Sequence, residues 1–133
     1  MREYTKIYIT KKADFSAKLG HPWVFEDEII RIEGDYADGD LVDVMNDKAR
    51  YIGTGFINNH SKIRVRIISR NANDKFDEKF FERRLRYAVE YRQTVMPGED
   101  FKCCRLIFGE ADFLPGLTVD RFNDVLVAQV LSL

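Results

Sequence analysis

The chain has 133 residues, of which 45% are hydrophobic and 32% are charged, and its formal net charge at pH 7 is −1. These values are typical of a soluble globular protein with one ordinary domain or two small ones. No apolar run approaches the roughly 20 residues of a membrane-spanning helix, and the N-terminus lacks the apolar segment of a secretory signal. The sequence therefore predicts a cytoplasmic protein without a membrane partner.

The first 70 residues are rich in short alternating segments and in turn-forming residues. We expect strands at residues 4–9, 29–33, 41–45, 51–57 and 62–67, a short helix at 13–19 and a loop at 20–25. Gly53 and Gly55 within one strand indicate a bulge or a sharp bend. Many short strands with glycine-rich turns predict a small β-barrel that ends near Arg70.

A basic strand within this barrel is the strongest sign of a partner. In the segment 62–67 every second residue is apolar, and the opposite face carries Lys62, Arg64 and Arg66. Residues 48–73 contain six bases and no acid, whereas residues 26–47 contain nine acids and one base. Regularly spaced cations, joined by Arg70, can meet successive phosphates of an RNA backbone. The alternative is an ordinary solvated face.

An aromatic segment near the N-terminus is a second candidate feature. His21, Trp23 and Phe25 could form a platform on which an unpaired base stacks, with Lys18 holding a phosphate. The alternative is that Trp23 packs in the core, since tryptophan is usually well buried. The candidate RNA-binding residues are therefore Lys18, His21, Trp23, Lys62, Arg64, Arg66 and Arg70.

The second half of the chain predicts a different kind of domain. A polar linker at 71–75 separates a barrel domain at 1–72 from a domain at 73–133, and Asp77 can cap a helix that runs to about Val95. The helix has a core-facing stripe of Phe81, Leu85, Ala88, Val89 and Arg92, and a second stripe of Phe80, Tyr87 and Tyr91 that suits contact with another domain. Strands are expected at 102–108, 117–122 and 124–133. The predicted fold class is mixed α/β (α+β), with a small barrel followed by a helix and antiparallel strands.

The last ten residues, 124–133, are apolar on both faces of the predicted strand. This pattern is typical of a strand inside a covered sheet. We therefore expect a covering element to follow, which makes the second domain incomplete. The alternative is a strand buried within a complete small domain.

The acids of the second half resemble a catalytic pair only superficially. Glu110, Asp112 and Asp120 lie near each other in sequence, but no further element supports general acid–base chemistry or metal binding. We expect Asp120 to pair with its neighbour Arg121 or to cap a turn. Gly109 and Gly116 indicate unusual backbone angles in the same connection.

The two cysteines are also poor catalytic candidates. Cys103 and Cys104 are adjacent on a predicted strand, cannot form a relaxed disulfide with each other, and are interpreted as packing residues. Dinucleotide-binding, P-loop, zinc-protease and nucleophile-elbow motifs are absent from the sequence. The chain therefore offers no catalytic site of its own.

Two stretches of the chain form distinctive motifs. The first is Lys18-Leu19-Gly20-His21-Pro22-Trp23-Val24-Phe25, followed by residues 39–44. The second is Arg105-Leu106-Ile107-Phe108-Gly109-Glu110-Ala111-Asp112, followed by residues 114–122. Together they resemble the large-subunit ribosomal RNA cytosine-5 methyltransferases. The second stretch is the more specific, because its spacing of glycine, proline and acids is unusual.

The resemblance implies a PUA domain, named for pseudouridine synthases and archaeosine transglycosylases, over about residues 1–70, and most of a middle domain from about residue 74. It also implies a third, Rossmann-like domain, absent from this chain, that holds the catalytic cysteine and binds S-adenosylmethionine (SAM). Neither Cys103 nor Cys104 then inherits a catalytic role. The chain is expected to be an RNA-binding fragment without a cofactor of its own, and the parent protein is expected to use SAM to methylate ribosomal RNA.

Another class of function remains open. The chain could be a protein–protein interaction or scaffolding module without RNA activity, in which the aromatic helix stripe and the terminal strand dock a protein. A homodimer through the middle domain, or through the parent's missing domain, is compatible with either function. A complete small enzyme using Asp112 and Asp120 is the weakest alternative, since no cofactor or nucleophile motif supports it.

Overall fold

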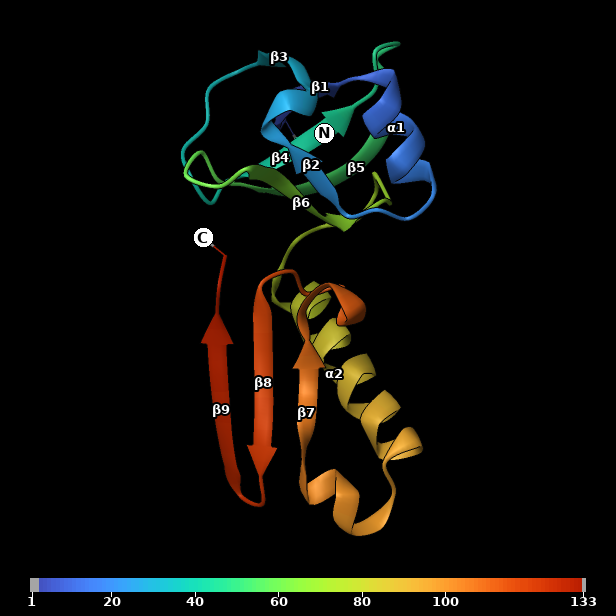
Figure 1. The fold of residues 1–133 in the computed structure, drawn as a ribbon, viewed down its shortest axis with the longest axis vertical. Coiled ribbons are helices and arrows are strands. Elements are labelled where there is room, and N and C mark those ends of the chain that lie inside the picture. The colour runs from blue at the N-terminus through green and yellow to red at the C-terminus, as the bar shows by residue number, and fades with distance from the viewer. Residues whose placement is uncertain (1–2, 133) are drawn as a thin grey trace. The chain divides into compact units, whose positions relative to one another are not determined.

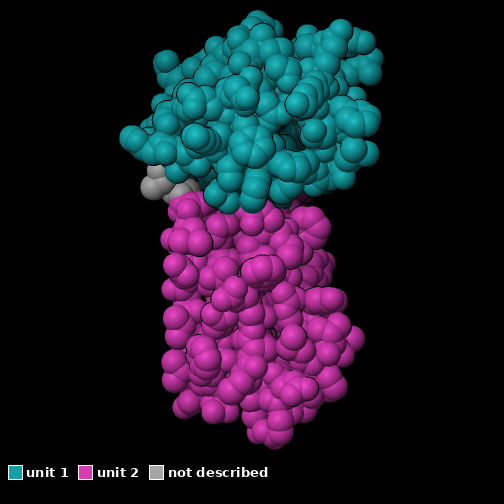
Figure 2. All heavy atoms as spheres, viewed as in Figure 1, with its two compact units in different colours: residues 1–73, 133 teal, residues 74–132 magenta. Residues whose placement is uncertain are grey.

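A computed structural model describes residues 3–132 of the chain. The chain divides into two compact units: unit 1 ends at Asn73, and unit 2 spans Asp74–Ser132 (Figure 2). Each unit has its own hydrophobic core. Within residues 3–132, no helix combines the length and the apolar character that a membrane crossing requires.

Unit 1 is built from short strands and one short α-helix. In chain order the elements are β1 (Thr5–Ile9), α1 (Lys11–Lys18), β2 (Trp23–Phe25), the 3-10 turn η1 (Glu26–Glu28), β3 (Ile29–Glu33), β4 (Leu41–Met45), β5 (Tyr51–Ile57) and β6 (Ile63–Ser69). The strands form one six-stranded sheet in the order β2-β6-β5-β4-β1-β3 (Figure 1). Neighbouring strands are antiparallel except β1 and β4, which run parallel.

The sheet of unit 1 curls around a core of buried aliphatic side chains. The core contains Ile7, Ile9, Val24, Val42, Val44, Ile57, Val65 and Ile67 from the strands and Ala13 from α1. A Cβ on Gly55 would overlap the backbone carbonyl of Arg66, and the register of β5 with β6 shifts beside this glycine. The irregularity predicted from the glycines of β5 is confirmed, because only a residue without a side chain permits this close approach.

Unit 2 contains one long helix and an antiparallel meander. Its elements are α2 (Glu78–Val95), the 3-10 segment η2 (Gly98–Lys102), β7 (Cys103–Phe108), the 3-10 turn η3 (Gly109–Asp112), β8 (Leu117–Phe122) and β9 (Val125–Val130). The strand order is β7-β8-β9 (Figure 1). The Asp77 carboxylate accepts a hydrogen bond from the Phe80 N–H at 3.0 Å, which confirms the predicted helix cap.

Helix α2 covers only part of this sheet. Ala88 of α2 packs with Leu106 and Ile107 of β7 and with Leu114, and Leu117 and Val119 of β8 lie at the margin of this cluster. Every residue of β9 is exposed. The strand predicted at the end of the chain is confirmed over Val125–Val130, but its two faces are open. The element expected to cover it stays a prediction.

Three local predictions require correction. The expected loop at 20–25 is wrong at its end, because Trp23–Phe25 adds a short strand to the edge of β6. The second helix stripe is not uniform, since Phe80 is buried while Tyr87 and Tyr91 are exposed.

The third correction concerns Asp120. It pairs with Arg105 instead of its neighbour Arg121, because Arg105 lies directly opposite it on β7. Adjacent residues of a strand point to opposite faces, so Arg121 is directed away and donates to the Asn123 carbonyl at 2.8 Å.

Candidate nucleic-acid interface

An aromatic cluster lies in unit 1 where β2 begins. The ring centroids of His21, Trp23 and Phe25 lie between 5.8 and 6.3 Å from one another. Trp23 and Phe25 alternate with the buried Val24, so both rings project from the outer face of the sheet. His21 is exposed and the other two rings are partly exposed. The cluster therefore offers aromatic surface to solvent while its strand is anchored by Val24.

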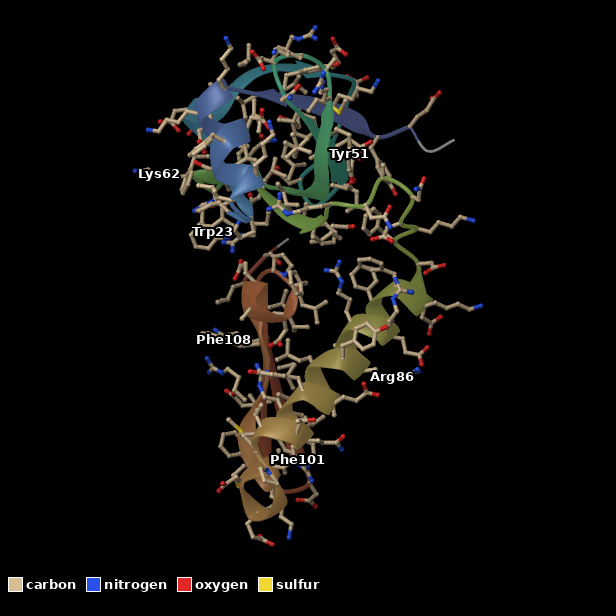
Figure 3. The ribbon with its side chains drawn as sticks, turned by 90° about the vertical axis from the view of Figure 1, so that its right-hand side faces the viewer. Trp23, Tyr51, Lys62, Arg86, Phe101 and Phe108 are labelled. Atoms are coloured by element: carbon tan, nitrogen blue, oxygen red, sulfur yellow. The ribbon has the colours of Figure 1, made fainter. Side chains whose placement is uncertain are left out.

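Two cations lie beside this cluster. Arg66 is the cross-strand partner of Trp23, and its guanidinium carbon is 5.6 Å from the centroid of the Trp23 ring. Lys62 is exposed and borders the same hollow as His21 and Phe25. Figure 3 shows Trp23 and Lys62 on the same flank of unit 1. The structure thus brings four of the predicted residues together.

Arg64 is held within the unit. Its side chain is 16% exposed, lies 3.0 Å from the Glu26 carboxylate and donates to the Asn59 side-chain oxygen at 2.9 Å. Its Nε atom is buried without a hydrogen-bond partner. Arg64 therefore shapes the surface between its neighbours and is not a freely projecting cation like Lys62.

Arg70 and Lys18 also form bonds inside unit 1. The Arg70 guanidinium donates to the carbonyls of Ala17 and His21 at 2.7 and 3.1 Å, which fixes the end of α1 against the aromatic segment. Lys18 lies 2.9 Å from Asp14, one helical turn earlier, although most of its side chain is exposed. Arg70 therefore positions the cluster, whereas Lys18 can still reach a ligand.

The hollow beside the cluster is mixed in charge. It holds about 870 Å³ and is lined by the cations Lys12 and Lys62 and by the acids Glu26, Asp27 and Glu28. Glu26 pairs with Arg64, and Glu28 accepts a hydrogen bond from the Phe25 N–H at 3.0 Å. These acids make the surface near η1 less favourable for a polyanion than the surface near Trp23.

The geometry suits a stacked base better than a row of phosphates. A π face with an arginine beside it can bind a base and its attached phosphate together. The evenly spaced cation row expected along β6 is interrupted, because Arg64 is mostly buried and paired. This part of unit 1 is therefore suited to a short unpaired segment of nucleic acid.

Two of the candidate acids of unit 2, Asp112 and Asp120, form ion pairs. Asp112 lies 2.8 Å from Arg92, and both side chains are about one-tenth exposed. Asp120 lies 2.8 Å from Arg105, whose hydrogen bonds hold the pKa of the Asp120 carboxyl below its ordinary value. Because each acid is committed to an arginine, the two do not form a general acid–base pair. Within residues 3–132, no cluster of three His, Cys, Asp or Glu residues could hold a metal ion.

The structure contains an ion pair, Arg92 with Asp112, that the sequence did not predict. Arg92 was identifiable only as a charged residue on an apolar helix stripe, and Asp112 only as one of three nearby acids. A buried arginine requires a carboxylate partner, so these two observations together were the available signal. Their pairing joins α2 to η3 across 20 residues of chain.

Most of unit 1 is similar to a known domain family. Residues 7–70 match the family model described as a PUA-like domain. This range runs from β1 to just beyond β6 and includes the aromatic cluster and the two cations beside it, Lys62 and Arg66. Residues 7–70 are thus similar to PUA-like domains.

The relatives of the chain extend the similarity beyond the PUA-like domain. Proteins named ribosomal RNA large subunit methyltransferase I are 40% identical over 126 residues in Pseudoalteromonas translucida, 38% over 126 residues in Aeromonas salmonicida and 33% over 129 residues in Klebsiella pneumoniae. These alignments cover 95 to 97% of this chain but only 32% of each relative. The chain thus spans about a third of the length of these relatives.

Solved structures share the fold of both units. A Streptococcus mutans protein described as a SAM-dependent methyltransferase matches 96% of this chain and 33% of its own chain, with a TM-score of 0.79 and 16% identity. A methyltransferase solved with SAH gives the same values. At this identity the match shows only that the chain shares its fold with these proteins.

Proposed function

We propose that this chain is the RNA-binding N-terminal part of a cytoplasmic, SAM-dependent methyltransferase that modifies cytosine C5 in large-subunit ribosomal RNA. The observation that carries the proposal is the similarity to the named methyltransferases over 95% of the chain, with a PUA-like domain within it. Since the chain aligns with a third of each relative, methyl transfer is assigned to the rest of the parent protein.

In this proposal the PUA-like domain binds RNA close to the cytosine that is methylated. The Trp23 platform stacks an unpaired base, and Lys18, Lys62 and Arg66 contact the backbone. Arg64 and Arg70 position these groups through their bonds to Glu26 and to the end of α1. Backbone contacts supply salt-dependent affinity, while the choice of target comes mainly from the methylating domain.

In this proposal SAM binds outside the described residues. Helix α1 follows Thr10 and helix α2 follows Asp77, and neither N-terminus follows a glycine-rich turn of the kind that cradles nucleoside ligands. SAM is therefore assigned to the remaining domain of the parent, where it supplies the methyl group. A cytosine must leave its stack to be methylated. A separate unit that binds the nearby RNA would keep the substrate in place while the base is unstacked.

Fluorescence anisotropy with a labelled single-stranded fragment of large-subunit ribosomal RNA tests the proposal. The 133-residue chain carrying Lys62→Glu and Arg66→Glu should bind at least about tenfold more weakly at 0.1 M salt, with a shallower salt dependence. The matched control is Lys6→Glu with Lys48→Glu, which makes the same charge change at exposed positions of β1 and of the β4–β5 turn. This control should retain most of the affinity.

Two outcomes would overturn the proposal. Equal losses of RNA affinity in the two double variants would mean that binding depends on net charge alone and not on the aromatic surface. Binding of SAM to this chain, detected by isothermal titration calorimetry, would contradict the assignment of the cofactor to another domain.

A scaffolding module is the second candidate, favoured by the exposed apolar residues of β9 and by the exposed Tyr87 and Tyr91. It predicts a stable homodimer in light scattering and an RNA affinity that does not change when Lys62 and Arg66 are substituted. The names of the relatives support the RNA-binding proposal over this one.

A further inference from the structure

Unit 2 contains a groove that the proposed function does not use. It lies between α2 on one side and β7 with η3 on the other, holds about 880 Å³ and is lined by residues of unit 2 alone. Its lining includes four aromatic residues that are between 53% and 67% exposed: Tyr87, Tyr91, Phe108 and Phe113. The four rings therefore concentrate exposed aromatic surface at this groove.

Arginines accompany these rings. The guanidinium carbons of Arg84, Arg92 and Arg105 lie 5.5, 5.0 and 5.4 Å from the ring centroids of Phe113, Tyr91 and Phe108, respectively. The only carboxylate among the described lining residues is Asp112, which is paired with Arg92. Arg105 is in turn paired with Asp120 of β8, so the three arginines and these two acids leave one net positive charge beside the π faces. This combination is complementary to a polyanion that carries flat bases.

The polar floor of the groove disfavours an added β-strand. Arg92 Nε donates to the Arg105 carbonyl at 2.9 Å, and the Asp112 carboxylate accepts from the Phe108 N–H at 2.7 Å. These side chains occupy backbone groups of β7, the edge strand, that a docking strand would need. An extended peptide is thus a poor occupant, whereas a ligand recognised through ring faces is not affected.

Phe113 presents its ring at an energetic cost. Its φ is 58°, in the left-handed region that favours glycine, and its carbonyl accepts a hydrogen bond from Arg84. Burial lowers the pKa of Arg84 from its ordinary value, but an arginine remains charged at neutral pH. A strained backbone that holds an exposed aromatic ring beside a cation is a feature expected at binding sites.

We propose that this groove binds a single-stranded RNA segment, with unpaired bases stacked on Tyr87, Tyr91, Phe108 and Phe113 and with Arg84 and Arg105 contacting phosphates. The inference rests on the proposed RNA binding of the chain and adds a second contact site outside the PUA-like domain. Binding at the groove should tolerate different RNA sequences, because every base has a π face that can stack.

The test uses the whole 133-residue chain and a single-stranded RNA that contains 2-aminopurine. Two exposed rings are removed in the variant Tyr87→Ala with Phe113→Gly, in which glycine suits the left-handed backbone and the fold should persist. We expect affinity to fall at least about fivefold and the stacking-induced quenching of 2-aminopurine to decrease. Photocrosslinks from 5-iodouridine RNA should map to the groove.

Matched controls lie outside the groove. Phe122→Ala removes an aromatic ring of similar exposure from β8, and Arg86→Gln removes a cation from the flank of α2 that lies opposite Phe108 in Figure 3. Both should bind RNA like the unchanged chain. Arg105→Gln, by contrast, should weaken binding and reduce its salt dependence.

The outcomes separate this inference from the proposed function. The Lys62 and Arg66 reversals could weaken RNA binding while the groove variant keeps its affinity and no photocrosslink maps to the groove. In that case the proposed function holds and the groove site is wrong. If the chain binds no RNA, both proposals are wrong. A homodimer that dissociates in the groove variant would show that the rings form a protein interface and would also overturn the inference.

Discussion

The six-stranded sheet of unit 1 curls around its own core, whereas the three-stranded sheet of unit 2 is covered by one helix along one strand. In unit 1 the residues of the apolar core come from five strands and one helix, and among its charged side chains Asp14 is buried and Arg64 is mostly buried. In unit 2 the apolar core is small, and a buried ion pair lies beside it.

This contrast shows how two units of one chain can depend on different interactions. The curled sheet obtains its stability from apolar burial, which is nondirectional and spread over many residues. Unit 2 depends more on a few directional contacts, because Arg92 and Asp112 join α2, β7 and η3. We therefore expect single polar substitutions to affect unit 2 far more than unit 1.

The largest effect is expected for Asp112→Ala. Removal of this carboxylate leaves Arg92 buried without its ion-pair partner, so unit 2 should lose about 3–5 kcal/mol of unfolding free energy. Denaturation followed by the helical circular dichroism signal reports mainly on α2, the longer helix. The fluorescence of Trp23, the only tryptophan, reports on unit 1 and should keep its midpoint.

The double variant Arg92→Met with Asp112→Leu provides the control for this prediction. Replacing both charges by apolar groups should restore much of the loss, because no charge is left buried alone. A single Asp112→Ala variant that unfolds at the same denaturant concentration as the unchanged chain would show that the pair is not important for unit 2.

A smaller effect is expected from a matched pair of valines. Val65→Ala removes a fully buried side chain from β6 and should cost about 2 kcal/mol, from lost burial and the cavity left behind. Val127→Ala removes the same atoms from an exposed position of β9 and should change stability by less than about 0.5 kcal/mol. Urea denaturation measures both; a large cost at Val127 would mean that β9 is covered in solution.

The Glu26–Arg64 ion pair of unit 1 should be weaker than the Asp112–Arg92 ion pair of unit 2. Glu26 is 66% exposed, so Glu26→Ala should cost about 0.2–1 kcal/mol, even though Arg64 is mostly buried. The Trp23 fluorescence transition measures this loss. A cost equal to that of Asp112→Ala would remove the proposed difference between the two units.

The elements with a clear period were predictable from the sequence. The strands at Leu41–Met45, Tyr51–Ile57 and Ile63–Ser69 follow from alternation, and α2 follows from its cap and spacing. Strand β2 was not predictable, because three residues after a proline are too few to show an alternation of apolar and polar side chains. These residues form a strand only because they pair with the edge of β6.

The candidate site was predictable in composition but not in geometry. The sequence identifies Trp23 and Arg66 as candidates, yet their pairing depends on the register of β2 with β6. The burial of Arg64 depends on η1, which brings Glu26 to it. The unit 2 groove depends on Phe113 adopting a left-handed backbone, which is unusual for phenylalanine and has no sequence signal.

The smallest effect is expected for the exposed pair Arg105 and Asp120. The hydrogen bonds from Arg105 are the main cause of the lowered pKa of the Asp120 carboxyl, so Arg105→Gln should move this pKa back up toward its ordinary value. A carboxyl whose pKa is lowered on folding adds stability above its unfolded pKa, and this contribution is lost as pH falls through the folded pKa. NMR titration of the Asp120 side chain measures the shift, and the unfolding midpoint should depend less on pH below about 4 in the variant. An unchanged Asp120 pKa would mean that the pair is open in solution, leaving the Asp112 pair as the main ionic contact of unit 2.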